Sequence, residues 1–165
     1  GAKVMLGAGD WDLLANARRP MPGGTPKKDL VAEDGATLTL GDTAVRIVLT
    51  PGHTPGAYGL IFDVKDRGTP VTVAYASGTA MLNRPDFYPQ FVASQKKMAA
   101  AAAAAGATVL LSNHTAFDGA LTKARLAAWR PAGAPNPFVV GKDAVGNYFT
   151  VMTECALAAQ SLLPK

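Results

Sequence analysis

Hydrophobic and polar residues alternate along the first half of the chain with the two-residue period that predicts β-strands. Four such segments follow one another with short gaps, at 36–40, 44–49, 58–65 and 70–76. Gly41-Asp42 and Arg67-Gly68 separate neighbouring segments and are typical of tight turns. The pattern therefore predicts a meander of antiparallel hairpins.

The residues before this meander are less regular. A strand is predicted at 2–6 and a helix at 10–15, with Asp10 as the helix N-cap. Residues 18–28 hold a cluster of Pro and Gly that forbids regular structure, so they are predicted to form a loop.

After Pro85 the hydrophobic period lengthens to the value of an α-helix. A long helix is predicted from Phe87 through the alanine run, ending with Gly106 at its C-terminus. A strand at 108–111 and helices at 117–129 and 142–163 complete the order. Strands followed by helix, strand and helices predict a layered α/β protein whose first part is mostly antiparallel.

Several large or apolar side chains are predicted to pack in the interior. They are Trp11, Trp129, Tyr148 and Phe149, with Tyr148, Val151, Met152 and Cys155 on the inner face of the last helix. Cys155 is the only cysteine, which rules out an intrachain disulfide and a zinc site built of cysteines. Inside an apolar helix we expect it to behave as a small buried hydrophobic residue.

Composition narrows the class of protein. The 165 residues are 48% hydrophobic, enough for one globular domain or a large part of one. The net charge is +4, but Lys and Arg are scattered, so no nucleic-acid partner is predicted. The longest apolar stretch, 98–107, is too short to cross a membrane, and no signal peptide is recognised. Because residue 1 is not Met, we expect a processed or partial product.

The chain has two histidines, and each follows a predicted strand. His53 lies in Thr50-Pro51-Gly52-His53-Thr54-Pro55-Gly56, and His114 follows the strand at 108–111. Prolines and a glycine stiffen and turn the first loop, which fixes the direction of an imidazole as a metal site requires. The alternative is that both histidines are turn residues, since zinc in a catalytic site needs at least three protein ligands.

A third polar segment follows a strand in the same way. Ser77-Gly78-Thr79 comes directly after the strand at 70–76, so Ser77 and Thr79 are predicted to line the same pocket as the histidines. An ordinary turn is the alternative. The chain lacks a Gly-x-Ser-x-Gly nucleophile motif and the glycine-rich phosphate-binding motifs.

Taken together, these segments resemble a known family. The succession 50–56, Ser77-Gly78-Thr79-Ala80 and Leu110-Leu111-Ser112-Asn113-His114 resembles the second half of the metallo-β-lactamase fold. It is similar to the periplasmic, histidine-rich branch, close to one β-lactamase subclass, and residues 1–4 and 136–156 fit that branch too. The resemblance implies the C-terminal ββα half of an αββα sandwich, with a mostly antiparallel sheet and flanking helices.

The resemblance also implies a metal site and an activity. His53 would bind the first of one or two zinc ions and His114 the second. A metal-bound hydroxide would attack an amide or ester such as a β-lactam. Ser77 and Thr79 would contact the substrate, and Thr54 and Asn113 would hold the ligands in place by hydrogen bonds. Gly78 occupies the position where some relatives place a metal-bridging Asp or a Cys, which argues against a site of the glyoxalase type.

The sequence departs from the family at its main motif. The signature His-x-His-x-Asp-His is nowhere in the 165 residues, so we expect the N-terminal half to be missing, no catalytic residue in this chain, and little or no activity of the chain alone.

Half a sandwich would expose a large apolar face. We therefore expect a partner, either the protein's own N-terminal half or a second, domain-swapped copy, in addition to a small-molecule substrate. The resemblance implies a periplasmic or secreted protein. The alternative function is a non-catalytic relic of the fold that serves in binding or assembly.

Overall fold

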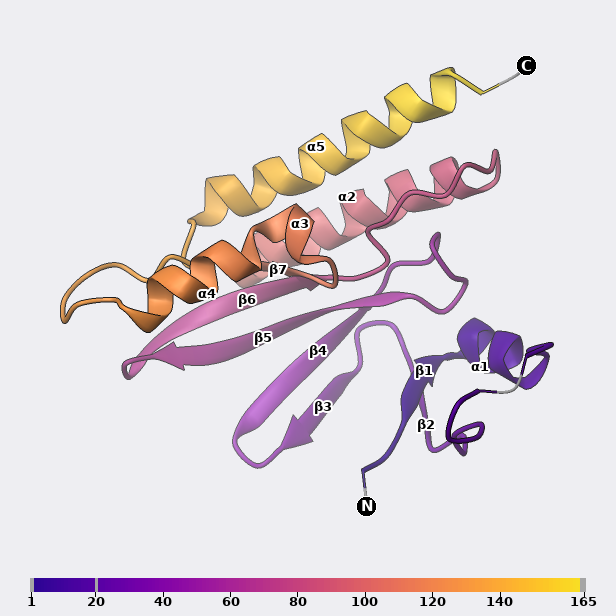
Figure 1. The fold of residues 1–165 in the computed structure, drawn as a ribbon, viewed down its shortest axis with the longest axis horizontal. Coiled ribbons are helices and arrows are strands. Elements are labelled where there is room, and N and C mark those ends of the chain that lie inside the picture. The colour runs from indigo at the N-terminus through magenta and orange to yellow at the C-terminus, as the bar shows by residue number, and fades with distance from the viewer. Residues whose placement is uncertain (1, 20, 164–165) are drawn as a thin grey trace.

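The computed structural model describes residues 2–19 and 21–163. Its main element is a five-stranded sheet in the order β3-β4-β5-β6-β7 (Figure 1). The strands are β3 (Thr37–Leu40), β4 (Thr43–Leu49), β5 (Tyr58–Asp66), β6 (Thr69–Ala76) and β7 (Val109–Ser112). β3 to β6 pair antiparallel in sequence order, and β7 runs parallel to β6. The predicted meander of hairpins is confirmed.

The turns of the meander lie where the sequence predicts them. Gly41, between β3 and β4, has a φ of 62°, and Arg67 and Gly68, between β5 and β6, have φ values of 50° and 91°. Positive φ suits glycine and strains other residues. The register pairs Val45 with Phe62 and Phe62 with Val73, so apolar side chains line up across the strands on one face.

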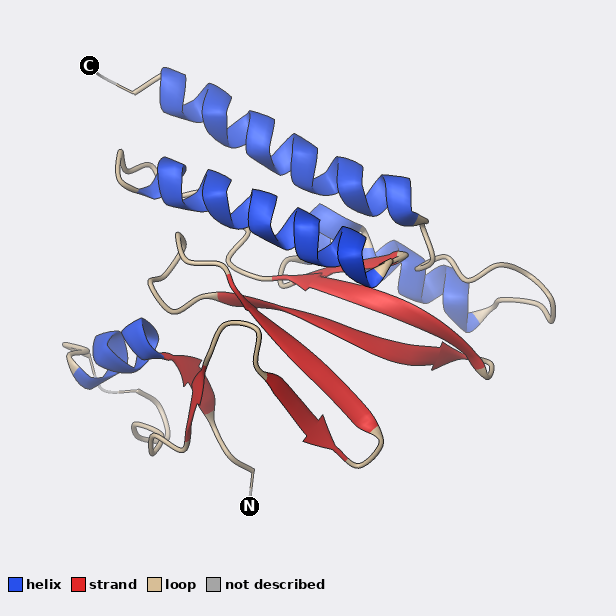
Figure 2. Cartoon of the chain, turned by 180° about the vertical axis from the view of Figure 1, so that it is seen from behind, coloured by secondary structure: helices blue, strands red, loops and turns tan. Residues whose placement is uncertain are grey.

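Two long helices cover one face of this sheet, as Figures 1 and 2 show. They are α2 (Phe87–Ala105) and α5 (Lys142–Ser161). α2 ends at Gly106, whose φ of 67° gives the left-handed C-cap that the sequence predicts. The predicted helix at 142–163 is likewise confirmed, apart from its last residues.

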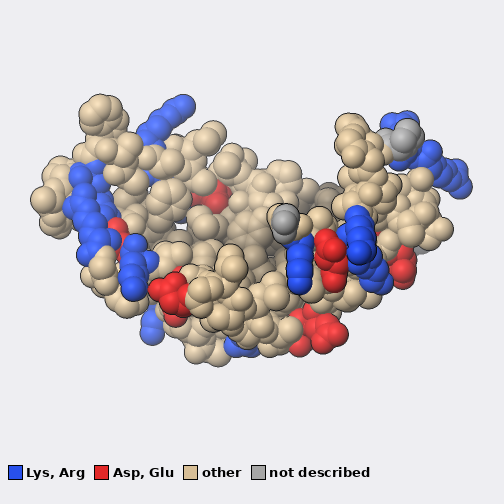
Figure 3. All heavy atoms as spheres, turned by 90° about the horizontal axis from the view of Figure 1, so that it is seen from below, with Lys and Arg blue, Asp and Glu red and all other residues tan. Residues whose placement is uncertain are grey.

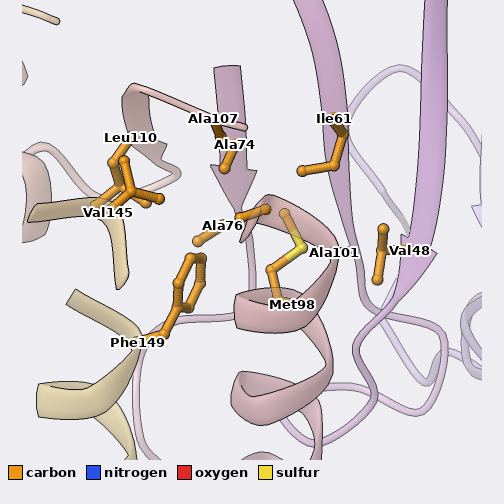
Figure 4. Packing of buried hydrophobic residues seen from close by; sticks show 11 residues of the cluster. Val48, Ile61, Ala74, Ala76, Met98, Ala101, Ala107, Leu110, Val145 and Phe149 are labelled. Atoms are coloured by element: carbon orange, nitrogen blue, oxygen red, sulfur yellow. The ribbon is translucent and has the colours of Figure 1, made fainter. Parts of the chain in front are cut away.

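The core lies between the sheet and these helices. Val48, Ile61, Ala74 and Leu110 from the strands meet Met98 of α2 and Phe149 of α5 (Figure 4). Within the alanine run, Ala101 and Ala102 are buried there, which lets α2 lie close to the sheet. A second cluster, built on Phe87, Phe91 and Met152, packs the start of α2 against α5.

The opposite face of the sheet is open over β3, β4 and β5. Leu38, Leu40 and Val64 are 40%, 87% and 43% exposed. Val45, Leu60 and Phe62 line a groove there, together with the charged residues Asp42, Asp63 and Lys65. The view from below shows a hollow in the middle of the molecule, with Lys, Arg, Asp and Glu gathered mostly on its flanks (Figure 3).

The N-terminal segment differs from its prediction. β1 (Met5–Gly7) pairs in parallel with β2 (Leu30–Ala32), a three-residue strand that sequence patterning missed because it is too short to show alternation. α1 (Ala8–Ala15) starts two residues earlier than predicted, and its N-cap is Gly7. The prediction of Asp10 as N-cap is therefore wrong, since its carboxylate is engaged by another loop.

The predicted helix at 117–129 is in fact two helices. α3 (Thr115–Asp118) and α4 (Ala120–Ala128) are separated by Gly119, whose φ of 68° breaks the helix. Trp129 follows α4 and is 88% exposed, so its predicted packing role is wrong, whereas Trp11 is 5% exposed as predicted.

The inner face of α5 is partly different from the prediction. Val145, Phe149, Met152 and Ala156 are buried, with the three- and four-residue spacing of one helical face. Tyr148 is half-buried beside them. Val151 is 58% exposed and Cys155 is exposed, so both predictions of burial are wrong. No helix in the described part of the chain is long and apolar enough to span a membrane.

Candidate functional site

A cleft of about 320 Å³ lies at the end of the sheet where β4, β6 and β7 finish. These three strands run in the same direction, so the loops that follow them meet at this end. Four of the six predicted site residues line the cleft: His53, Thr54, Ser77 and Asn113. Asp10, which sequence analysis placed only as a helix cap, lines it as well.

The His53 side chain is half-buried and has a defined orientation. Its Nδ1 lies 2.8 Å from the carbonyl oxygen of Ala80. Because a carbonyl oxygen can only accept a hydrogen bond, Nδ1 carries the proton and Nε2 keeps its lone pair. An Nδ1–H donated to a backbone carbonyl is the arrangement typical of metal-binding histidines.

Gly78 makes room for this imidazole. A Cβ at position 78 would lie 3.1 Å from the Cβ of His53, and the φ of Gly78 is 62°. Both the contact and the backbone conformation disfavour a larger residue. Gly78 therefore contributes space to the site, and no side chain.

The loop that carries His53 is held against α2. The hydroxyl of Ser94 donates to the carbonyl of Pro51 at 2.6 Å. A Cβ at Gly52, whose φ is 146°, would lie 3.2 Å from the Cα of Phe91. The N–H of Thr50 donates to the carbonyl of Ala57 at 2.8 Å and closes the base of the loop.

Asp10 holds the same loop from the other side. Its Oδ2 accepts a hydrogen bond from the Thr54 hydroxyl and its Oδ1 accepts one from the Gly56 N–H, both at 2.8 Å. Thr54 thus bonds to Asp10, and its role in holding a zinc ligand stays a prediction. No spacing rule connects residues 44 positions apart, so the sequence carried no signal for this contact.

Ser77 and Thr79, the two residues predicted to contact a substrate, both make hydrogen bonds within the chain. The Ser77 hydroxyl donates to the carbonyl of Tyr58. Thr79 is fully buried, and its hydroxyl donates to Oδ1 of Asn113 at 2.8 Å. Ser77 therefore borders the cleft, Thr79 lies beneath it, and their contact with a substrate stays a prediction.

His114 lies next to the cleft but does not line it. It is exposed, occupies the N-cap of α3, and packs edge-on against Phe117 with ring centroids 5.8 Å apart. The buried carboxylate of Asp118 accepts hydrogen bonds from the N–H groups of Ser112 and Ala120, at 2.7 and 2.8 Å. This loop, like that of His53, is bonded to an aspartate. Sequence analysis did not single out Asp118, and it considered Asp10 only as a helix cap.

These residues do not make a complete zinc site. Within residues 2–19 and 21–163, no three His, Cys, Asp or Glu side chains come together as a group that could hold a metal ion. His53 and His114 supply at most two imidazoles, and zinc takes at least three protein ligands in catalytic sites. The site of this chain alone does not fit a bound zinc ion.

Comparison with solved structures identifies the fold. The subclass B3 metallo-β-lactamase of Bradyrhizobium japonicum matches with a TM-score of 0.73 and 32% identity, over 98% of this chain and 65% of that one. A β-lactamase from Chitinophaga pinensis matches with a TM-score of 0.71 and 25% identity, over 97% and 64%. A class B3 di-zinc metallo-β-lactamase from an Alaskan soil metagenome matches with a TM-score of 0.66 and 20% identity, over 98% and 63%.

The chain therefore carries part of a metallo-β-lactamase fold and is related to metallo-β-lactamase enzymes. It spans about two thirds of the length of these structures. No protein-family model matches the chain, and no curated protein sequence matches it either.

Proposed function

We propose that this chain is part of a zinc-dependent hydrolase that opens an amide or ester bond, such as that of a β-lactam. The observation that carries the proposal is the His53 imidazole, which lines the cleft and donates Nδ1–H to the Ala80 carbonyl, so that Nε2 keeps its lone pair. The match to β-lactamase structures over nearly the whole chain supports it.

In this proposal His53 and His114 each supply one ligand, and the remaining ligands come from outside the 165 residues. The complete protein would hold one or two zinc ions, whose chemistry is to lower the pKa of bound water and polarise a carbonyl. The chain's own contribution is to hold two imidazoles at the edge of the sheet. In this proposal Ser77, which borders the cleft, contacts the substrate, and the hydrogen bond between Thr79 and Asn113 supports the loop of His114.

The large solvent-accessible area of the chain supports the proposal that it binds a partner polypeptide. The chain exposes 10137 Å², whereas a compact monomer of its mass, 17.0 kDa, exposes about 7,700 Å². The excess of roughly 2,400 Å² is well above the approximately 800 Å² that each partner contributes to a standard interface. Even with part of this area assigned to the extended loop before β2, the excess supports the proposal of a large interface with a partner.

The proposed occupant of the open sheet face is a polypeptide that carries the His-x-His-x-Asp-His motif, as the protein's own N-terminal half would. The groove contains the apolar side chains Val45, Leu60 and Phe62, and such side chains suit the interior of a sandwich. The cleft lies at the edge of the same sheet, so a partner packed on this face can also reach His53. A second copy of the chain would cover the face without adding the ligands.

Mass spectrometry tests both parts of the proposal. Protein isolated from its natural source is measured under native and denaturing conditions, with zinc quantified in the same sample. We expect a polypeptide that carries the motif, with one or two zinc ions, and β-lactam hydrolysis by that material. A dimer of this chain without zinc would contradict the proposed partner, and a monomer without zinc would contradict both the partner and the hydrolase.

A variant locates the zinc site in this chain. In the assembled protein His53→Ala should lower zinc affinity by more than the approximately 10- to 100-fold that outer hydrogen-bond partners cost. Glu154→Ala, at an exposed position of α5 on the other side of the sheet, is the matched control and should leave zinc affinity unchanged. Equal zinc affinity in His53→Ala and the control would remove His53 from the ligand set.

The second candidate function is a non-catalytic binding or assembly domain. It is favoured by the lack of a three-residue metal group in the described residues. Zinc stoichiometry separates the two, because a relic of the fold holds none. We further propose a periplasmic or secreted location, which cell fractionation would test.

A further inference from the structure

We propose that Asp10 is a positioning residue for His53, acting through Thr54 and Gly56. The inference rests on the proposed role of His53 as a zinc ligand, although the geometry it describes belongs to this chain alone.

Both carboxylate oxygens of Asp10 are committed to the His53 loop. Oδ2 accepts from the Thr54 hydroxyl and Oδ1 from the Gly56 N–H, each at 2.8 Å. A carboxylate in the first turn of a helix is favoured by the helix dipole in any case. The helix dipole would favour Asp10 without any contact to another segment. The two hydrogen bonds, in contrast, join Asp10 to residues 44 and 46 positions further along the chain. The carboxylate therefore joins α1 to the loop.

The fit between α1 and the loop is too close for side chains. A Cβ on Gly7 would lie 2.3 Å from the carbonyl oxygen of Gly56, and a Cβ on Gly9 would lie 2.8 Å from the Cβ of Pro55. A Cβ on Gly56 would lie 2.7 Å from the backbone nitrogen of Asp10. Three glycines thus let the two backbones touch, and this contact brings the Asp10 carboxylate within bonding distance of the loop.

The constraint extends to the imidazole. Thr54 is the next residue after His53, and the carbonyl of Thr54 accepts from the N–H of Gly52 on the other side of the histidine, at 3.1 Å. With Thr54 fixed by Asp10 and Pro51 fixed by Ser94, the backbone of His53 is held at both ends. The ring can then keep its bond from Nδ1 to the Ala80 carbonyl. Loss of Asp10 frees one end of this segment.

The experiment measures the ring of His53 directly. Nitrogen NMR of the neutral imidazole distinguishes a single Nδ1–H tautomer from a mixture of the two tautomers. We expect one tautomer in the parent chain. Asp10→Asn and Thr54→Val should give an averaged mixture, and Thr54→Ser, which keeps the hydroxyl, should restore the single tautomer. Asp66→Asn is the control, because it removes a comparable carboxylate contact at the far end of β5.

The outcomes separate a positioning role from general loss of stability. A single tautomer in both Asp10→Asn and Thr54→Val would overturn the proposal, as would a mixture in Asp66→Asn. If Asp10→Asn does not fold, the Thr54→Val and Thr54→Ser pair decides by itself. The measurement needs no zinc and no substrate, so failure of the hydrolase proposal leaves its result unaffected.

Discussion

The guanidinium of Arg130 donates to both carboxylate oxygens of Asp66, at 2.6 and 2.9 Å. Arg130 follows α4, and Asp66 is the last residue of β5, so the pair joins the loop after α4 to the β5–β6 hairpin. Arg67 adds two hydrogen bonds, to the carbonyls of Arg130 and Pro131 at 2.9 and 3.0 Å. A planar guanidinium suits such a two-pronged contact in a way that a lysine ammonium does not.

Arg130→Lys should therefore loosen the segment at 129–137. The expected result is faster proteolytic cleavage in this segment and a lower melting temperature, because one ammonium cannot replace two parallel bonds. Limited proteolysis followed by mass spectrometry locates the cut. Arg125→Lys, on exposed α4, is the control and should behave like the parent chain. Equal cleavage rates in the two variants would contradict the structural role of the pair.

The same pair predicts a pH dependence. The hydrogen bond from Arg130 holds the pKa of Asp66 below its usual value. A carboxyl whose pKa is lower in the folded state stabilises the fold above its unfolded-state pKa, and this contribution is lost as the pH falls through the folded-state value. The melting temperatures of the parent and Asp66→Asn should therefore converge as the pH falls below about 4. A constant difference down to acid pH would show that the charge of Asp66 contributes nothing.

Gly56 and Gly146 predict opposite effects of the same substitution. Gly56→Ala places a Cβ 2.7 Å from the backbone of Asp10, so it should destabilise the fold by about 1–3 kcal/mol. A Cβ on Gly146, inside α5, meets nothing within 4 Å. Gly146→Ala should therefore stabilise by about 0.4–1 kcal/mol, because alanine favours the helix. Urea unfolding measures the change in the free energy of unfolding for each variant. An unchanged free energy of unfolding in Gly56→Ala would contradict the close contact of α1 with the loop.

Tyr148 predicts a loss of stability at alkaline pH. Burial raises the pKa of Tyr148 to about 12, from an ordinary value of 10.0, and the nearby charge of Asp118 adds to the shift. The unfolded chain releases this proton near pH 10, whereas the folded chain holds it to about 12, so stability falls as the pH rises between the two. Tyr148→Phe should remove this part of the alkaline loss.

Phenolate absorbance measures the titration itself. Burial also raises the pKa of Tyr58, so Tyr58→Phe is the comparison that assigns the late-titrating signal. If the signal near pH 12 persists in Tyr148→Phe, the assignment to Tyr148 is wrong.

The two tryptophans should differ in their fluorescence. Trp11 is buried and donates its indole N–H to the carbonyl of Leu30 at 2.8 Å, whereas Trp129 is 88% exposed. In Trp129→Phe the remaining emission comes from the buried Trp11 and should lie at shorter wavelength. The free energy of unfolding should change by no more than about 0.5 kcal/mol. Trp11→Phe should leave the long-wavelength emission of an exposed indole. A marked loss of stability in Trp129→Phe would show that the exposed ring has a packing role.

The sequence by itself determined the elements whose signals are local. Alternation predicted the hairpins of β3 to β6, and the helical period with Gly106 predicted α2 and its end. The motif around His53 placed that residue on a loop after a strand, and the position of Ser77 after another strand predicted its place in the same cleft. Each of these follows from spacing or turn chemistry within a few residues. Thr79, which was predicted to line the cleft with Ser77, is buried instead.

The tertiary structure alone decided the contacts between distant residues. Asp10 bonds to Thr54, and Asp118, which the sequence analysis did not single out, accepts a hydrogen bond from Ser112 beside His114. Val151 and Cys155 are exposed because the buried face of α5 is set by where α2 packs, which no helical period within α5 specifies. Side-chain partners are set by packing across the fold, and this is why the contacts of Asp10 and Asp118 with the two histidine loops came only from the structure.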